Sequence, residues 1–326
     1  MTGLYDSWQR QINYLRISIT DFCNLNCTYC SEGNVAKLPR EEILSYEEIS
    51  RLVTIAASMG INKVRLTGGE PLLRPNLTRL VKMINYTPGI DDIALTTNGT
   101  LLAKYAKDLK EAGLTRVNVS LDTLRRERFK EITGRDNLSQ VLAGIELAEQ
   151  VGLTPVKVNM VVMRGENDDE VIDFARKTID DGWNVRYIEY MPFNASVAES
   201  ALLVPSREIK TRLNVLGHME RCGTKKGNGP ARYFRFPGVK GTVGFISPIT
   251  EHFCATCNRL RMTSDGHLRP CLLDDDEIDI KKTLRSGGND EELKAIIERA
   301  VAIKHERHHL NEGEKAPERP MRQIGG

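Results

Sequence analysis

The chain has 326 residues, of which 40% are hydrophobic and 28% charged, and its formal net charge is +2. This composition is typical of a globular protein with a sizeable core, either one large α/β domain or two smaller ones. So small a net charge argues against binding to nucleic acid or membranes through charge alone, and no apolar run reaches membrane-spanning length. The polar first twelve residues indicate no secretory signal, so we expect a cytoplasmic protein.

Strands and helices are expected to alternate as far as residue 191. The first strand, residues 14–20, alternates apolar and polar side chains, and a capping box at Ser45 and Glu48 predicts a helix that ends at Gly60. The further strands are expected at 63–67, 93–97, 116–122, 156–162 and 185–191, and the helices between them at 75–87, 101–112, 138–151 and 168–180. This order predicts parallel βαβ units with right-handed crossovers. About six such units are too few for a complete eight-unit barrel.

The alternation ends near residue 192. A short helix is expected at 206–213, and short strands at 231–236 and 241–247. We therefore divide the chain into a first domain, residues 1–200, and a C-terminal extension, residues 201–326.

Three cysteines, Cys23, Cys27 and Cys30, follow the first strand. Their spacing is too tight for a disulfide framework and leaves one ligand missing for a closed metal site. Three thiolates can hold three irons of a [4Fe–4S] cluster and leave the fourth iron open for chemistry. A zinc site that lacks its fourth ligand is the alternative.

A second group of three cysteines lies in the extension at Cys254, Cys257 and Cys271. Zinc with His252 or His267 as the fourth ligand is a serious competitor here. Against it, only one residue separates His252 from Cys254, and His267 follows a turn. If neither histidine binds, a second open iron is free to take the substrate. The seventh cysteine, Cys222, is assigned no role.

Cationic residues recur on the polar faces of the expected strands. Lys63, Arg65 and Thr67 share one face of their strand because side chains alternate. Further cations lie on other strands, where acidic partners are few. Burying such a cation without a partner would cost several kcal/mol. These cations are Arg16, Lys157 and Arg186, with Arg259 and Arg261 after the second cysteine group. In a barrel wrapped by helices they would line the lumen, where they predict an anionic ligand such as a polyphosphate. The alternative is that they extend to solvent at the rim.

The first cysteine motif, with Tyr29 before its last cysteine, resembles the radical S-adenosylmethionine superfamily. The segment Gly68-Gly69-Glu70-Pro71 matches that superfamily's GGEP segment. The resemblance implies an α/β fold with a partial (β/α)6 TIM-like barrel, open on one side. It also implies that the open iron holds S-adenosylmethionine, which yields a 5′-deoxyadenosyl radical. The residues that it places around this cofactor are Tyr29, Gly69, Ser120 and Met191.

The two cysteine groups in this order resemble the GTP 3′,8-cyclase family, from the first strand to the last residue. The resemblance implies a lyase that converts GTP to (8S)-3′,8-cyclo-7,8-dihydroguanosine 5′-triphosphate, the first step of molybdenum cofactor biosynthesis. It implies two [4Fe–4S] clusters, S-adenosylmethionine, an electron donor protein and a homodimer, and no nucleic-acid or membrane partner. The implied GTP-binding residues are Arg16, Lys63, Arg65, Thr96, Lys157, Arg186, Arg259 and Arg261. The implied catalytic residues are Arg259, Arg261, Gly325 and Gly326.

One departure from the family and two alternatives remain. The family commonly has Met-Pro after the third cysteine, where this chain has Ser31-Glu32, so the local loop path is in doubt. A peptide-modifying radical enzyme is one alternative, but such enzymes typically carry more C-terminal cysteines. A metal-stabilised RNA-binding module is the other, and it predicts surface aromatic residues, whereas aromatic residues make up only 6% of this chain.

Overall fold

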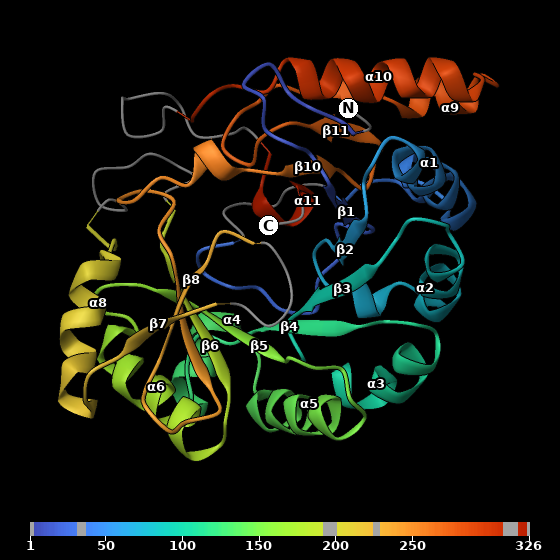
Figure 1. Ribbon diagram of the computed structural model, residues 1–326. Helices are drawn as coiled ribbons and strands as arrows, with labels where there is room; N and C mark the ends of the chain where they lie inside the picture. Colours follow the sequence, from blue (N-terminus) through green and yellow to red (C-terminus); the bar gives the residue numbers. More distant parts are fainter. Residues whose placement is uncertain (1–2, 31–36, 192–200, 224–228, 309–318, 325–326) are drawn as a thin grey trace.

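The computed structural model describes residues 3–30, 37–191, 201–223, 229–308 and 319–324. Strands β1 to β6 lie side by side in chain order, and each pair is parallel. They are β1 (Tyr14–Ser18), β2 (Lys63–Thr67), β3 (Asp92–Thr97), β4 (Arg116–Ser120), β5 (Lys157–Val162) and β6 (Asn184–Glu189). Together with the helices between them they form a curved α/β layer, which confirms the predicted partial barrel (Figure 1).

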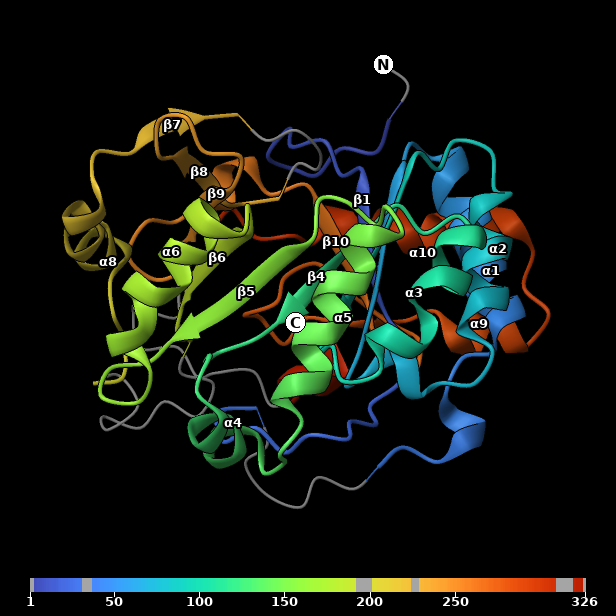
Figure 2. The same cartoon turned by 90° about the horizontal axis from the view of Figure 1, so that it is seen from below.

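Helices cover the outer side of these strands (Figure 1). They are α1 (Tyr46–Ser58), α2 (Leu77–Asn85), α3 (Leu102–Glu111), α5 (Leu138–Gln150) and α6 (Val171–Asp180). The short helix α4 (Arg126–Thr133) instead packs against the loop of the first three cysteines, where the Asn26 N–H donates to the Thr133 carbonyl at 2.9 Å (Figure 2). The capping box of α1 is confirmed, because the Glu48 backbone N–H donates to Ser45 Oγ at 3.1 Å and the Ser45 N–H donates to Glu48 Oε2 at 2.6 Å. Helix α4 was not predicted, because its sequence is strongly polar and leaves only a short apolar stripe.

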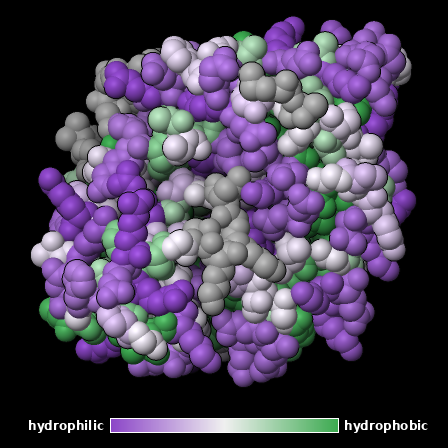
Figure 3. Space-filling view, viewed as in Figure 1, coloured by the Kyte–Doolittle hydropathy of each residue, from purple (hydrophilic) through white to green (hydrophobic). Residues whose placement is uncertain are grey.

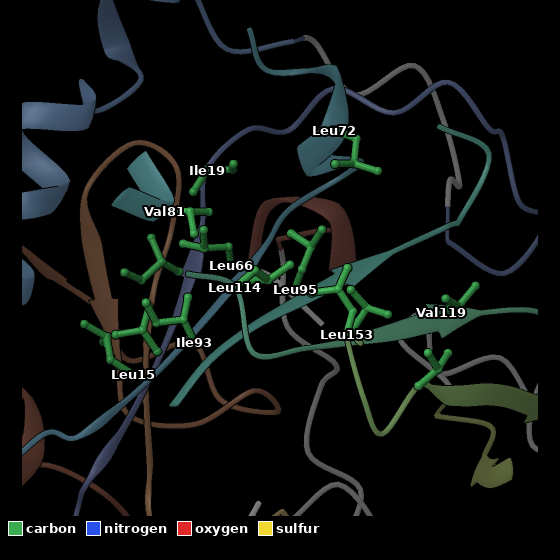
Figure 4. Packing of buried hydrophobic residues seen from close by; sticks show 14 of the residues in the cluster. Leu15, Ile19, Leu66, Leu72, Val81, Ile93, Leu95, Leu114, Val119 and Leu153 are labelled. Carbon is green, nitrogen blue, oxygen red and sulfur yellow. The ribbon is translucent and has the colours of Figure 1, made fainter. Parts of the chain in front are cut away.

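The core lies between the strands and these helices. On β1, Leu15 is 3% and Ile17 0% exposed, so the apolar face predicted for this strand points to the helices. Figure 4 shows Leu15, Leu66 and Ile93 from neighbouring strands packed in one cluster. Burying each such side chain contributes about 1.5–3 kcal/mol. The opposite, polar faces of the strands are thereby left for the lumen.

The C-terminal extension continues the sheet at both edges, in the order β12-β11-β10-β1 through β6-β9-β8-β7. Strand β10 (Arg259–Met262) runs parallel to β1, and β9 (Thr242–Ile246) runs parallel to β6. The other strands are β7 (Glu220–Cys222), β8 (Arg232–Arg235), β11 (His267–Arg269) and β12 (Ile278–Asp279). The helices are α8 (Ser206–Leu213), α9 (Lys281–Arg285), α10 (Asp290–Ala302) and α11 (Met321–Ile324). Figure 2 shows β10 beside β1, so the segment that directly follows Cys254 and Cys257 is part of the barrel sheet.

Hydrophilic side chains cover most of the face shown in Figure 3. The outer helices explain this, since α3 for example exposes Lys104, Lys107 and Glu111. Within the described parts of the chain, none of the helices combines the length and the apolar character needed to cross a bilayer.

Candidate active site

A single cavity of about 310 Å³ lies at the carboxyl ends of the barrel strands and holds both cysteine groups in its wall. We call Cys23, Cys27 and Cys30 the first set, and Cys254, Cys257 and Cys271 the second set. All six are free thiols that line this cavity. The expectation that both groups face one shared chamber is confirmed.

Two glycines let the end of β2 approach the loop of the first set. A Cβ atom on Gly69 would lie 2.3 Å from the Phe22 carbonyl oxygen, and one on Gly68 would lie 2.3 Å from the Thr20 carbonyl oxygen. The Gly69 N–H donates to that Thr20 oxygen at 2.8 Å, and the Glu70 N–H donates to the Phe22 oxygen at 2.6 Å. The double glycine is therefore required by close backbone packing, and Gly69 also lines the cavity as predicted for a cofactor contact.

Glu70 connects the same loop to β3. Its buried carboxyl group accepts hydrogen bonds from Leu72 N, Asn98 N and Thr97 Oγ1, the first at 2.9 Å. Burial raises the pKa of Glu70 to about 7, although these three hydrogen bonds act to lower it. The Asn98 amide then donates to Asn24 Oδ1 at 2.9 Å, between the first two cysteines. The cysteine loop is thus held by the ends of two strands.

Asp122 is a site residue that the sequence analysis missed. Tyr29 Oη donates to Asp122 Oδ2 at 2.7 Å, and the Val161 N–H donates to Asp122 Oδ1 at 2.8 Å. Asp122 is 6% exposed and lines the cavity. Burial raises the pKa of Asp122 to about 6, although both hydrogen bonds oppose the rise. The only sequence signal was an acid just beyond the end of a strand.

The thiols of the first set are hard to ionise. Burial, with the Asp122 carboxylate beside it, raises the pKa of Cys27 well above its ordinary value. Burial and the neighbouring Cys23 raise the pKa of Cys30 to about 11. Thiolate formation here needs a compensating positive charge, which a bound metal centre would supply.

The second set has the opposite surroundings. Arg259 Nη2 donates to Cys257 Sγ at 3.3 Å. Burial alone would raise the pKa of Cys257, but Arg259 and Lys304 outweigh it and lower that pKa to about 6. Cys257 therefore favours a thiolate before any metal binds, whereas burial raises the pKa of Cys254 in the same set.

The two histidines proposed as zinc ligands lie in different places. His267 Nδ1 is 3.3 Å from Asp265 Oδ2, and His267 is not among the residues that line the cavity. His252 stays a possible ligand, because ligand atoms of His252, Cys254 and His308 all lie within 4.8 Å of one another. The sequence analysis missed His308, which is 54 residues beyond Cys254 and lines the cavity.

Between the two sets the cavity wall is rich in arginine. Strand register places Arg16 directly beside both Arg65 and Arg261. Burial and these two neighbours hold the pKa of Arg16 well below its usual value. Arg65 Nε and Thr96 Oγ1 are buried without a hydrogen-bond partner among the described residues. Clustered cations and unsatisfied polar atoms in one wall indicate a polar, anionic ligand.

Most of the predicted contact residues line the cavity, and some do not. Those in the wall are Arg16, Tyr29, Arg65, Gly69, Thr96, Ser120, Arg186, Met191, Arg259 and Arg261. Lys63 and Lys157 share strand faces with the wall residues Arg65 and Asn159 but are not themselves in the wall, so their contact with a ligand stays a prediction. Gly325 and Gly326 lie outside the described residues.

The C-terminal helix α11 reaches the first set. Met321 and Arg322 line the cavity, and the Arg322 backbone hydrogen-bonds the Cys30 thiol. Arg319 anchors this end of the chain, since its Nη1 donates to Asp265 Oδ2 at 3.0 Å and its Nη2 donates to Glu277 Oε1 at 2.9 Å. The chain's last described residues thus stand at the site (Figure 1).

Comparison with known proteins agrees with this geometry. A Radical SAM superfamily model matches residues 17–178, and a model described as Molybdenum Cofactor Synthesis C matches residues 183–310. In fold, the chain is similar to Streptococcus suis SuiB bound to S-adenosylmethionine, with a TM-score of 0.61 at 16% identity over 87% of this chain and 67% of that chain. It is also similar to anSMEcpe with bound AdoMet, with a TM-score of 0.59 at 17% identity over 86% of this chain and 81% of that chain.

Closer relatives cover the whole chain. It is 50% identical to the GTP 3′,8-cyclase of Moorella thermoacetica over 324 residues, which are 99% of this chain and 100% of the relative. It is 51% identical to the GTP 3′,8-cyclase of Pelotomaculum thermopropionicum over 326 residues, again 99% and 100%. The resemblance stated from the two cysteine motifs is confirmed. The chain belongs to the GTP 3′,8-cyclase family of the radical SAM superfamily.

Proposed function

We propose that this chain is a lyase that converts GTP to (8S)-3′,8-cyclo-7,8-dihydroguanosine 5′-triphosphate, the first step of molybdenum cofactor biosynthesis. Its family membership and both matched models support this. The observation that carries the proposal is the row Arg65, Arg16 and Arg261, set side by side on neighbouring strands between the two cysteine sets. A triphosphate would bring negative charge to this row of three neighbouring guanidinium groups.

As a radical SAM protein the chain uses S-adenosylmethionine and an iron–sulfur cluster. When bound, these supply a 5′-deoxyadenosyl radical that removes a hydrogen atom from the substrate. The first set fits a [4Fe–4S] cluster with one open iron, because three thiols from one short loop face the cavity. We assign a second such cluster to the second set, with the guanine edge of GTP as the intended ligand of its open position. Zinc at this set is the competing assignment.

The residues around the first set hold the cofactor in this proposal. Tyr29, Gly69, Ser120 and Met191 are its contacts, and all four line the cavity. The Gly69 N–H already donates to the Thr20 carbonyl, so in this proposal the Gly69 carbonyl is the backbone group that binds the cofactor. The electron enters from a donor protein, and the active form is a homodimer.

The arginine wall orients the substrate. Arg16, Arg65, Arg186, Arg259 and Arg261 bind the nucleotide, with Thr96 as a neutral hydrogen-bond donor. Lys63 and Lys157, which lie just outside the wall, complete the proposed set of nucleotide-binding cations. Holding ribose and base in one geometry is the main contribution, because a well-oriented intramolecular attack gains about 7–11 kcal/mol at best. Arg259 and Arg261, together with the terminal Gly325 and Gly326, are the proposed catalytic residues.

Arg261→Ala tests the substrate assignment. Removing one guanidinium from the row should weaken GTP binding about 10- to 100-fold, as expected for a charged hydrogen-bond partner, and product should fall below detection. Iron and sulfide content should stay at the level of the unmodified protein, because Arg261 donates no hydrogen bond to a cysteine in the described part of the chain. GTP affinity is measured by anaerobic calorimetry and product by chromatography.

The control is Arg126→Ala, which removes an exposed arginine that pairs with Asp136 at 2.7 Å on the outer surface. It should change neither iron content nor GTP affinity. Undiminished GTP turnover by Arg261→Ala would show that the arginine row does not bind the substrate.

A further inference from the structure

The N-terminal residues form a folded hook beside the second set. The Ile12 N–H donates to the Leu4 carbonyl at 2.8 Å, and the Asp6 N–H donates to the Arg10 carbonyl at 3.1 Å. A turn at Gln9, with φ of 61°, closes the hook. We use the name N-terminal hook for residues 4–12. Its position is fixed locally, so it can support other parts of the chain.

Arg10 projects from this hook and is almost fully buried, with 8% exposed. Its Nε donates to Asp6 Oδ2 at 2.6 Å, which orients the guanidinium. Its Nη1 donates to the Cys254 carbonyl at 2.8 Å and to the Glu306 carbonyl at 2.7 Å. Its Nη2 donates to the His305 carbonyl at 2.6 Å. One side chain therefore joins three segments that are far apart in sequence.

Residues 302–308, which we call the strap, contact the chain around each of the second-set cysteines. The His308 backbone hydrogen-bonds the Cys254 thiol. Lys304 Nζ donates to the Pro270 carbonyl, next to Cys271, and its charge lowers the pKa of Cys257. His305 Nε2 lies 2.9 Å from Asp276 Oδ2, in the loop that follows Cys271.

The hook also holds the strap through bonds that do not involve Arg10. Ser7 Oγ donates to the Ala302 carbonyl at 2.8 Å, and Trp8 Nε1 donates to the Lys304 carbonyl at 3.1 Å. Arg10 alone, among the described residues, bonds both the strap and the backbone of a second-set cysteine. Three carbonyl oxygens converge on its guanidinium, and without it they would face one another with no donor between them in a part-buried place.

We propose that Arg10 is a positioning residue for the second set. It fixes the backbone of Cys254 against the strap, and the strap in turn places the thiols of Cys254 and Cys271 for metal binding. This rests on the proposed assignment of a metal centre to the second set. The first set should be independent of Arg10, because its loop is held by Glu70, Asn98 and Asp122 instead.

Two measurements on the full chain test this in Arg10→Gln, which keeps a polar side chain but loses the guanidinium group that bonds the three carbonyl oxygens. After anaerobic reconstitution, iron should fall from about eight to about four per chain, with the spectrum of a single [4Fe–4S] cluster remaining. In the metal-free chain, iodoacetamide should alkylate Cys254 and Cys271 at least several-fold faster, measured by peptide mass spectrometry. Alkylation of the first set should not change.

Arg212→Gln is the matched control. Arg212 also donates to a backbone carbonyl, that of Asp168 at 2.9 Å, and to a carboxylate, but it touches neither cysteine set. It should leave iron content and both alkylation patterns unchanged. If Arg10→Gln yields no folded protein, Asp6→Asn, which loosens Arg10 without removing it, should give the same pattern more weakly.

The outcomes separate this proposal from the proposed function. Equal iron and equal alkylation in Arg10→Gln and the unmodified chain would overturn the role of Arg10. Faster alkylation of both sets together would also overturn it, because the effect would then be general unfolding. If the unmodified chain itself holds one cluster and one zinc, the second cluster of the proposed function is wrong, while the alkylation pattern still decides the role of Arg10.

Discussion

Carboxyl groups act on Cys23 and Cys27 of the first set, with Arg322 as a cation near Cys30, whereas cations act on Cys257 of the second set. Asp122 stands beside Cys27, and Glu70 contributes a second acid near Cys23. At the other end, Arg259 bonds Cys257 directly and Lys304 adds a further charge. The ligand number and type are the same, so the difference lies in what surrounds them.

This difference has a direct consequence for metal centres held at the two ends. Negative charge near a cluster favours its oxidised form and lowers its reduction potential, and positive charge raises it. The acidic end is therefore suited to a strongly reducing centre, and the cationic end to one that binds an anion without giving up an electron. The same cations attract a triphosphate toward the second set and away from the first.

Removing one ligand from each set should separate the two roles and give the largest effects. In Cys30→Ala, both 5′-deoxyadenosine and cyclised product should fall below detection, because the radical source is lost. In Cys271→Ala, 5′-deoxyadenosine formation should persist while cyclised product disappears, because only substrate binding is lost. Both products are quantified by chromatography after anaerobic turnover with dithionite.

Cys222→Ala is the control, since this thiol belongs to neither set and lies on β7. It should keep both products. Loss of 5′-deoxyadenosine in Cys271→Ala as well as in Cys30→Ala would show that the two ends do not have separate tasks.

Asp122→Asn should reduce the difference in charge between the surroundings of the two cysteine sets. The amide keeps the shape but removes the charge and presents an N–H₂ group to either Tyr29 Oη or the Val161 N–H, where the carboxylate accepted from both. We expect 5′-deoxyadenosine formation to fall about 10- to 100-fold, as for other groups that support metal ligands. In the metal-free chain the pKa of Cys27 should fall, measured by alkylation rate against pH.

Glu170→Gln is the matched control for this change. Glu170 is also a buried carboxyl group that accepts from a hydroxyl and a backbone N–H, those of Thr123 and Leu124. It is not part of the cavity wall, so it should lower the thermal midpoint without shifting the pKa of Cys27. Equal shifts in the two variants would mean that Asp122 acts only through fold stability.

Much of the fold and both cysteine sets could be predicted from the sequence, for local reasons. Strand β2 and helix α5 followed from apolar periodicity, and the cysteine spacing picked out the six thiols that line the cavity. Short strands such as β10 and β11 carry too few residues for a period to show. Their place in the sheet is set by pairing with distant segments.

The missed site residues share a different cause. Tyr29 and Asp122 are 93 residues apart, and Arg10 and Cys254 are 244 apart, so no local pattern connects them. Lys63 and Lys157 share strand faces with residues of the cavity wall but lie outside that wall, so their contact with a ligand stays a prediction. Alternation of side chains fixes the face of a strand, but it does not fix how far along the strand a ligand lies.

Lys157 gives the finest test, because it lies beside Arg186 of the arginine wall and outside the cavity. Burial and the neighbouring Arg186 lower the pKa of Lys157 to about 6, so near pH 7.5 its amine is mostly neutral. A triphosphate bound above it should raise that pKa and draw in a proton. Proton uptake on GTP binding can be measured by calorimetry in buffers of different ionisation enthalpy. The unmodified chain should take up to about one proton more than Lys157→Arg, because the arginine is already charged before GTP binds.

The same shift fixes the sign of the pH dependence without ligand. Between about pH 6 and the ordinary pKa of 10.5, the unfolded chain holds a proton that folded Lys157 has released. The free energy of unfolding of the metal-free chain should therefore rise with pH across this window, and the rise should be smaller in Lys157→Met. Equal proton uptake by the unmodified chain and by Lys157→Arg would show that the triphosphate does not bind near Lys157 and Arg186.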